Sequence, residues 1–266
     1  MAGYEKVVTN SISLYYEDRG IGLPIVLLHG FCGSNEYWKY CLEELSEKNR
    51  VIAIDLRGHG HSAVAEDEFT VDEMADDVKK LLDSLEIERS VVLGHSLGGY
   101  VALALAENEP NLIAGLGLIH STPYADSEES KIGREKGIIQ INNQGINEFV
   151  TDLVPKLFSP ENLESHKGEV EFTKKLGYQT TPQGAIGTLQ AMKNRIDRSS
   201  FIKNYQGPLL LVAGKEDRVI PQEKTFITDG DHVKKVLLEH SGHMGMLEEP
   251  RRFVEEIKTF IDRVDS

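Results

Sequence analysis

The residues with the clearest chemical potential are Gly94-His95-Ser96-Leu97-Gly98, a serine with a glycine two positions to either side. The run 91–93 before them is short and apolar, which is typical of a buried strand. The run 100–109 after them is rich in helix-forming residues and is followed by a proline. G-x-S-x-G between a strand and a helix is typical of a nucleophile elbow, which presents the serine hydroxyl above a sheet. The pattern predicts that Ser96 is a nucleophile, although a structural Gly-rich turn has the same composition.

The geometry of the turn also explains the residues on either side of Ser96. A turn this tight leaves no space for side chains at positions 94 and 98, so glycine stands at both. The backbone N–H of Leu97 lies at the start of the following helix, where the helix dipole favours negative charge. We therefore expect Leu97 to offer one donor to the oxyanion that forms during acyl transfer.

A serine nucleophile needs a base, and the base needs an acid that orients it. In a parallel sheet, functional side chains gather in the loops after the carboxyl ends of the strands. One such loop carries Glu216 and Asp217, and the loop after the last predicted strand carries His240 and His243. Asp126, which follows another strand, is a third candidate acid. The order serine, acid, histidine is the one expected of this architecture.

The elements that must position these residues alternate between buried strands and helices. Strands are predicted at 25–28, 51–54, 91–93, 112–119, 209–213 and 234–238, after an N-terminal hairpin or edge strands at 7–9 and 12–18. Helices are predicted at 35–47, 71–85, 100–109 and 250–264. Thr70 and Glu73 form a capping box before the second of these helices, and Ser34 or Asn35 caps the first. Such alternation predicts an α/β fold with a doubly wound, mainly parallel sheet.

The pattern changes between residues 121 and 205. Apolar β-runs disappear, and helical stretches follow at about 128–142, 145–158, 160–177 and 182–199. We expect residues 1–120 and 206–266 to form one core domain. Residues 121–205 are then a helical cap inserted after the sixth strand.

Composition excludes some classes of function. The net charge of the 266 residues is −14 and no block of Lys or Arg stands out, which argues against nucleic acid and anionic membrane surfaces as partners. No apolar run reaches the length of a membrane span, and the N-terminus lacks the apolar segment of a signal peptide. Cys32 and Cys41 are too few for a disulfide framework. A soluble, cytoplasmic protein is expected.

Taken together, the motifs resemble those of the α/β-hydrolase fold family, in particular small capped serine hydrolases such as carboxylesterases and enol-lactonases. The resemblance spans nearly the whole chain. It rests on the elbow and on His29-Gly30-Phe31, Asp55-Leu56-Arg57-Gly58-His59-Gly60-His61-Ser62, Gly214-x-x-Asp217-x-x-x-Pro221 and Ser241-Gly242-His243.

The resemblance implies roles for individual residues. Ser96 is then the nucleophile, His243 the general base and later acid, and Asp217 the acid that orients it. In similar proteins the N–H of the residue after His-Gly is the second oxyanion donor, which here is Phe31 beside Leu97. His29 would support this loop through hydrogen bonds.

The expected reaction is hydrolysis of a small carboxylic ester or lactone through an acyl-enzyme on Ser96. A C–C bond hydrolase or a perhydrolase with the same triad is an alternative, and a non-catalytic small-molecule binding protein on the same fold is another. Similar C–C hydrolases grip a substrate carboxylate with a cap arginine. Arg195 and Arg198 are candidates for that contact here, or they lie on a solvated helix face.

The remaining expectations concern the pocket and cofactors. We expect the pocket to be walled by cap residues and by Phe31, Trp38, Met244, Met246 and Arg195, which suits a small apolar acyl group. His59 and His61 with Asp55 resemble part of a metal site, but further ligands at suitable spacing are missing. No metal and no cofactor are therefore predicted, and the expected partner is a small-molecule substrate.

Overall fold

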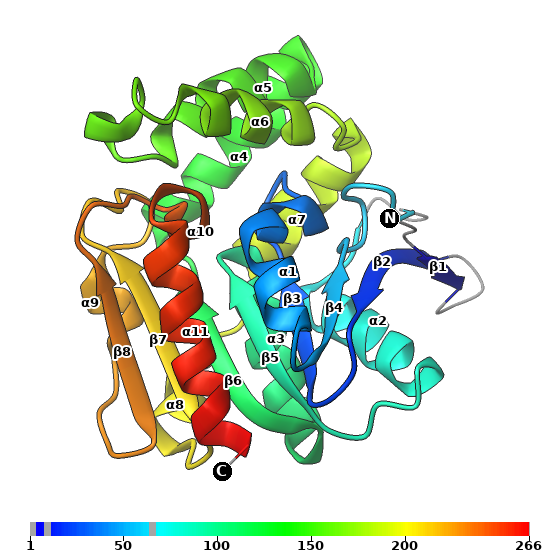
Figure 1. The fold of residues 1–266 in the computed structure, drawn as a ribbon. Coiled ribbons are helices and arrows are strands. Elements are labelled where there is room, and N and C mark those ends of the chain that lie inside the picture. Colours follow the sequence, from blue (N-terminus) through cyan, green and yellow to red (C-terminus); the bar gives the residue numbers. More distant parts are fainter. Residues whose placement is uncertain (1–3, 8–11, 64–67, 266) are drawn as a thin grey trace.

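The computed structural model describes residues 4–7, 12–63 and 68–265, and in this part of the chain eight strands form one sheet (Figure 1). The strands are β1 (Tyr4–Val7), β2 (Ser13–Arg19), β3 (Pro24–Leu28), β4 (Arg50–Ile54), β5 (Ser90–His95), β6 (Ile113–Ile119), β7 (Leu209–Gly214) and β8 (Val233–Leu238). Their spatial order is β1-β2-β4-β3-β5-β6-β7-β8. β2 pairs antiparallel with β1 and β4, and the other pairings are parallel. The predicted α/β fold with a mainly parallel sheet is confirmed, and part of the predicted strand at 7–9 lies outside the described residues.

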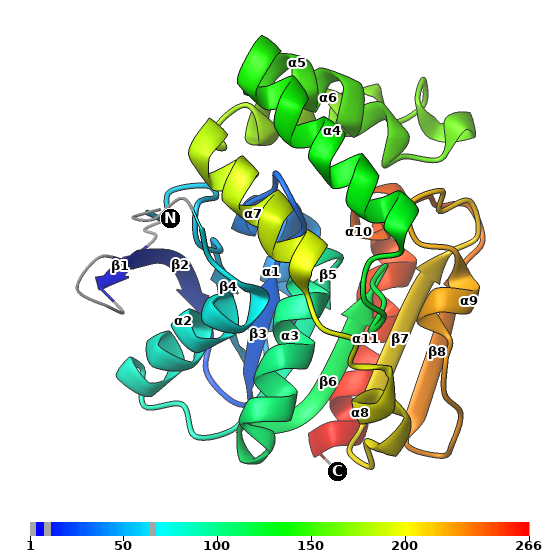
Figure 2. The same cartoon turned by 180° about the vertical axis from the view of Figure 1, so that it is seen from behind.

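Helices cover both faces of the sheet (Figures 1 and 2). The α-helices are α1 (Lys39–Ser46), α2 (Val71–Ser84), α3 (Leu97–Asn108), α4 (Glu128–Gln144), α5 (Ile146–Leu153), α6 (Lys167–Gly177), α7 (Pro182–Asn194), α8 (Ser199–Asn204), α9 (Gln222–Thr225), α10 (Gly245–Glu248) and α11 (Pro250–Asp265). Short 3-10 turns are η1 (Asn35–Trp38), η2 (Pro110–Leu112), η3 (Val154–Lys156) and η4 (Pro160–Asn162). α1 packs with α11 on one face, and α2 packs with α3 on the other.

The central strands are apolar along their whole length because both faces are covered. Every residue of β5, β6 and β7 is buried, and in β3 and β4 all but the first are. A strand that is buried on both faces is a continuous apolar run in the sequence rather than an alternating one. The bounds predicted from the sequence for these five strands therefore differ from the observed ones by at most two residues. The predicted capping box before α2 is also present, with Thr70 accepting from the Glu73 N–H and Glu73 accepting from the Thr70 N–H.

The order of strands changes direction next to β3. From β3 the chain passes to β4 on one side, and it then returns to β5 on the other side of β3. The loops that leave the carboxyl ends of β3 and β5 therefore diverge and leave a crevice between them, where parallel α/β sheets usually bind their ligands. Phe31 follows β3 and Ser96 follows β5, so both stand at this crevice.

Several predicted helices are shorter than expected. The stretch at 35–47 begins as the 3-10 turn η1, capped by Ser34, and continues as α1 to Ser46. The stretch at 160–177 divides into η4 and α6, and that at 145–158 into α5 and η3, where Pro155 lacks an N–H for the helix. α7 ends at Asn194 because Arg195 takes an extended conformation.

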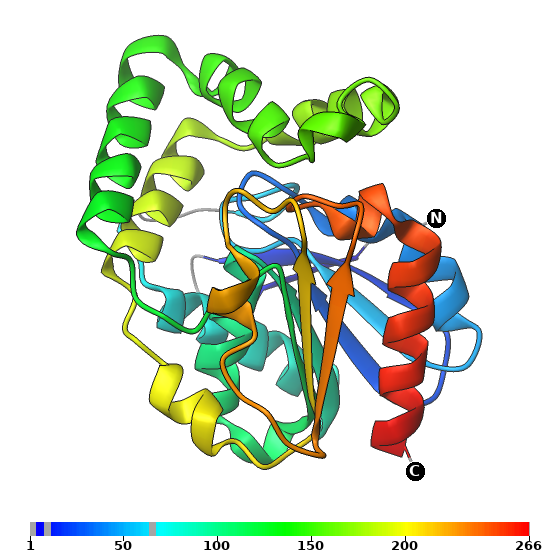
Figure 3. The same cartoon turned by 90° about the vertical axis from the view of Figure 1, so that its left-hand side faces the viewer.

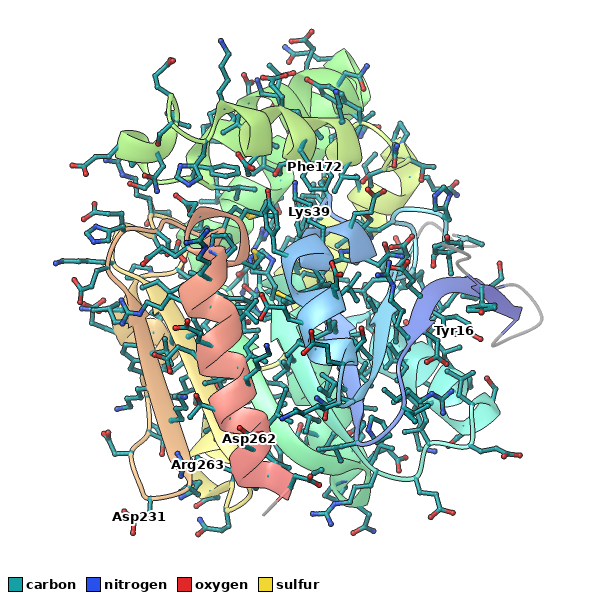
Figure 4. The ribbon with its side chains drawn as sticks, viewed as in Figure 1. Tyr16, Lys39, Phe172, Asp231, Asp262 and Arg263 are labelled. Carbon is teal, nitrogen blue, oxygen red and sulfur yellow. The ribbon has the colours of Figure 1, made fainter. Side chains whose placement is uncertain are left out.

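The helices between β6 and β7 lie at two different ends of the sheet. α4–α7 lie above the carboxyl ends of the strands, whereas α8 lies beside the opposite end of the sheet (Figure 3). The short α8 is thus apart from the other helices of the segment 121–205. Where α6 meets α1, the ammonium of Lys39 lies 3.7 Å from the centre of the Phe172 ring, a cation–π contact visible in Figure 4. No helix within the described ranges is both long and apolar enough to cross a bilayer.

Candidate active site

The turn between β5 and α3 holds Ser96 in a strained conformation. Its φ of 50° lies in the left-handed region, which a residue with a side chain adopts at a cost. The Ser96 N–H donates to the carbonyl of Ile119 at 2.9 Å and fixes the turn to β6. A Cβ at Gly94 would stand 2.2 Å from the Gly98 carbonyl oxygen, and one at Gly98 would stand 2.2 Å from that of Leu28. Glycine is thus required at both positions, as the motif predicts.

Asp217 and His243 come together from the loops after β7 and β8. His243 Nδ1 lies 2.7 Å from Asp217 Oδ2. The other carboxylate oxygen of Asp217 accepts the N–H groups of Val219 and Ile220 at 2.8 and 2.9 Å. The His243 N–H donates to the Leu157 carbonyl at 2.7 Å, so the segment after α5 helps to place the histidine.

Asp217 is held as a carboxylate. Burial alone would raise its pKa, but His243 and His120 beside it outweigh burial and keep the pKa well below its usual range. The carboxylate can therefore fix His243 with Nδ1 protonated, which leaves Nε2 free to take a proton.

The rival acids and histidine lie elsewhere. Glu216 and His240 are exposed to solvent, although each is close in sequence to a triad candidate. Asp126 is buried, but its oxygens bind the guanidinium groups of Arg134 and Arg195. Of these candidates, the structure pairs only Asp217 with His243.

A second histidine contacts the acid, and sequence reasoning missed it. His120 Nδ1 lies 3.2 Å from Asp217 Oδ2, and His120 Nε2 accepts the N–H of Gly245 at 3.2 Å. His120 is fully buried, and its φ of 46° is again in the left-handed region. Its position after the end of β6 is the signal that could have found it, since functional groups follow strand ends in this architecture.

His120, Asp217 and His243 also form the kind of cluster that can hold a metal ion. The hydrogen bonds argue for a different arrangement. Because Nε2 of His120 accepts from Gly245, a neutral ring carries its proton on Nδ1, which then donates to Asp217. A protonated nitrogen cannot ligate a metal, so the cluster is better described as one carboxylate with two imidazole donors.

Glu248 supports the loop of His243 and was also missed. Its Oε1 accepts the N–H groups of Gly242 and Met244, at 2.9 and 3.2 Å. Its Oε2 accepts the Ser159 N–H and the Asn162 side-chain amide, both at 2.8 Å. This buried carboxylate connects the histidine loop to the segment between β6 and β7.

Two backbone donors stand beside the nucleophile. The N–H of Leu97 is at the first position of α3, and that of Phe31 follows β3. Within the described residues neither N–H has a hydrogen-bond acceptor. Two unpaired donors at the crevice that contains Ser96 are what an oxyanion hole requires.

Ser96 and His243 line the same cavity, whose volume is about 60 Å³. Its other walls come from Phe31, Tyr37, His95, Tyr100, Arg134, Leu153, Leu157, Met192 and Val219. Larger hollows of about 400 and 440 Å³ lie elsewhere and include no member of the proposed triad. The cavity at Ser96 is thus small and mostly apolar, with one cationic side chain.

Four of the residues expected in the pocket are absent from these walls. Trp38 is fully buried and stacks on Phe253, with ring centres 6.3 Å apart. Met244 and Met246 are fully buried too, on the core side of the loop after His243. Arg195, the fourth, forms an ion pair with Asp126 instead. The walls come instead from segments far apart in sequence, which local patterns do not reveal.

Arg195 and Arg198 are neither on a solvated face nor in the cavity. The Arg195 guanidinium binds Asp126 and lies over the Tyr100 ring, 4.0 Å from its centre. Arg198 is buried and pairs with Asp72 and Glu107, so it ties the start of α8 to α2 and α3. Both arginines therefore form ion pairs within the protein where the chain returns to the core.

The other polar residues singled out in the loops make structural hydrogen bonds. His29 Nε2 accepts the Leu56 N–H at 2.9 Å, and burial lowers the pKa of His29 to about 3, so the ring is neutral. Asp55 accepts the N–H groups of Asn35 and His61 at 2.6 and 2.9 Å. Burial raises the pKa of the Cys32 thiol, which does not suit a nucleophile.

The fold and the motifs match those of known proteins. A profile of the family described as alpha/beta hydrolase fold matches residues 24–148. The structure superposes on an esterase from Thermogutta terrifontis, solved with malate bound, with a TM-score of 0.93 and 28% sequence identity over 100% of both chains. The chain has the α/β-hydrolase fold.

Curated relatives of this chain have different activities. It is 30% identical over 243 residues to the dihydrolipoyllysine-residue acetyltransferase component of an acetoin cleaving system from Pseudomonas putida. That alignment covers 90% of the chain but 64% of the relative, so the chain spans less than two thirds of the length of that protein. It is 26% identical to the pimeloyl-[acyl-carrier protein] methyl ester esterase of Aliivibrio fischeri strain MJ11, over 94% of the chain and 98% of the relative.

Proposed function

We propose that this α/β hydrolase cleaves small carboxylic esters or lactones through an acyl-enzyme on Ser96. The observation that carries the proposal is the 2.7 Å contact between Asp217 and His243, made at the cavity that also contains the strained Ser96. Esterases among the similar proteins support the choice of bond. A carboxylate orienting a histidine beside an exposed serine hydroxyl is the arrangement that activates serine for acyl transfer.

In the proposed reaction, Ser96 Oγ attacks the ester carbonyl carbon while His243 Nε2 takes the hydroxyl proton. The N–H groups of Phe31 and Leu97 donate to the oxyanion of the tetrahedral intermediate. The intermediate collapses when His243 returns the proton to the leaving alcohol, and the acyl group remains on Ser96. Water then attacks the acyl-enzyme, with His243 again as the base, and releases the carboxylic acid.

We further propose that α4–α7 act as a cap that limits the size of the acyl group. Leu153, Leu157 and Met192 come from this part of the chain and wall the cavity. Apolar walls around a volume of about 60 Å³ suit a short acyl chain better than a long one.

The deciding experiment compares hydrolysis of a p-nitrophenyl ester chain-length series by the wild type and by Ser96→Ala. We expect turnover of short esters and a loss of at least ~10³-fold in the variant. Ser165→Ala, which removes an exposed serine, is the matched control and should retain the wild-type rate. Labelling of Ser96 by a serine-directed phosphonate without ester turnover would move the substrate to lactones or C–C bonds. Absence of labelling would favour a non-catalytic binding protein.

A further inference from the structure

One cation stands among the walls of the cavity. Arg134 of α4 lines it together with Ser96 and His243. Its Nε donates to Asp126 Oδ2 at 3.1 Å, and its side chain is 25% exposed. Within the described part of the chain, neither terminal amino group of Arg134 donates a hydrogen bond to a protein atom. Arg134 thus has donors to spare at the place where a substrate would lie.

Near Arg134, two positive guanidinium groups are paired with a single carboxylate. Asp126 is the carboxylate that holds Arg134, but Asp126 also binds Arg195 at 2.5 Å, so two guanidinium groups share one carboxylate. Arg195 also donates from Nε to the carbonyl of Tyr124 and from Nη1 to the carbonyl of Met192. Of these two guanidinium groups, that of Arg134 lines the cavity with Ser96, so its terminal amino groups are placed to bind a ligand there.

The surroundings strengthen the attraction of Arg134 for an anion. Most of the other walls are apolar or aromatic, so water screens a charge here less than at the open surface. Guanidinium groups bind carboxylates through two parallel N–H···O bonds, and such charge-assisted bonds are about twice as strong as neutral ones. The net charge of −14 for the whole chain does not favour anions, so affinity for one must come from a local group.

We propose that Arg134 binds a second, unreactive carboxylate of the substrate, so that the preferred substrate is a half-ester of a small dicarboxylic acid or a lactone that carries a carboxylate. This inference rests on the proposed function, because it assigns the ester of the same molecule to Ser96. Arg134 and Ser96 line the same small cavity, so the two groups of the substrate should be only a few bonds apart.

The test measures binding separately from catalysis. Monomethyl succinate is compared with methyl 4-amino-4-oxobutanoate, which has the same number of heavy atoms but a neutral amide in place of the carboxylate. Both are titrated calorimetrically into Ser96→Ala, alone and combined with Arg134→Gln, Arg134→Lys or Lys136→Gln. Lys136 is exposed on the same helix, so Lys136→Gln makes the same change in net charge away from the cavity.

We expect the half-ester to bind Ser96→Ala roughly 10- to 100-fold more tightly than the amide, the range for a hydrogen-bonded ion pair. Arg134→Gln should remove this preference, Arg134→Lys should keep part of it, and Lys136→Gln should leave it unchanged. Equal binding of the two compounds, or a preference that survives Arg134→Gln, would overturn the inference.

Kinetics of the chain with Ser96 intact separate this result from the proposed function. If the half-ester binds through Arg134 but is not hydrolysed, the carboxylate site stands and the ester reaction fails. If both compounds are hydrolysed with equal kcat/KM, the ester reaction stands and the role of Arg134 fails. With both correct, the Arg134→Gln substitution raises KM for the half-ester more than it lowers kcat, because the contact exists before and during the reaction.

Discussion

Replacement of Glu248 by glutamine tests how the histidine loop is held. The carboxylate is 5% exposed and accepts four hydrogen bonds, two at each oxygen. Glutamine has the same shape but only one accepting oxygen, and its NH₂ group would face two donors. Either the N–H groups of Gly242 and Met244 or those of Ser159 and Asn162 must then lose their acceptor.

The magnitude follows from the number of donors left without a partner. A buried donor that loses its acceptor costs about 1–3 kcal/mol, so two of them cost about 2–6 kcal/mol. The side-chain amide of Asn162 can turn toward water, whereas backbone N–H groups cannot. We therefore expect Glu248→Gln to lower the free energy of unfolding by about 2–4 kcal/mol.

Urea unfolding followed by circular dichroism measures this difference. Glu239→Gln is the matched control, because Glu239 forms an exposed ion pair with Lys215 and such pairs contribute about 0–1 kcal/mol. Ester hydrolysis by Glu248→Gln should also fall, since the loop it supports carries His243. A variant as stable as Glu239→Gln would refute the view that this carboxylate holds the two segments together.

Two further predictions concern other buried polar groups. His120→Phe removes the second donor to Asp217 and should lower kcat/KM for esters roughly tenfold. His120→Asn should recover part of this loss, because its amide nitrogen can replace Nδ1 as the donor. Equal rates of the two variants would contradict this role. Burial raises the pKa of Asp55 in the folded protein from 3.8 to about 6, so protonation of this carboxyl favours the folded state. Its contribution to stability is therefore largest below pH 3.8 and is lost as the pH rises through about 6. The stability of the wild type relative to Asp55→Asn should accordingly decrease by about 2 kcal/mol between pH 4.5 and 7 in urea titrations, and a pH-independent difference would show that the pKa of Asp55 is not raised.

The sequence predicted those parts of the structure that depend mainly on residues close together in the chain. Strands buried on both faces must be apolar throughout, so β3 to β7 stand out as short apolar runs. The elbow is readable because its turn admits only glycine at positions 94 and 98. The resemblance to α/β hydrolases also selected Asp217 over the exposed Glu216 and His243 over the exposed His240, and the structure brings the selected pair within 2.7 Å.

Contacts between segments that are far apart in the sequence could not be predicted in this way. Trp38 suits a substrate pocket by its type, but its ring stacks on Phe253 of α11 and is fully buried. Arg195 suits a solvated helix face by its type, but α7 ends before it and Asp126 binds it. Arg134 faces the cavity because α4 crosses above the strand ends, which depends on how α4–α7 pack and not on any residue next to Arg134.

Two buried acids give this site its electrostatic character, and they do so in opposite ways. Asp217 receives two backbone N–H groups and two histidines, so its charge is satisfied within the fold and held away from Ser96. Asp126 receives two guanidinium groups, and its charge is more than neutralised. The positive charge of Arg134, which lines the cavity, is therefore not fully neutralised by Asp126. In the proposed reaction this charge would favour both the oxyanion and a substrate carboxylate. Removing Arg134 should therefore affect both, and the carboxylate more, because the carboxylate would contact the guanidinium directly.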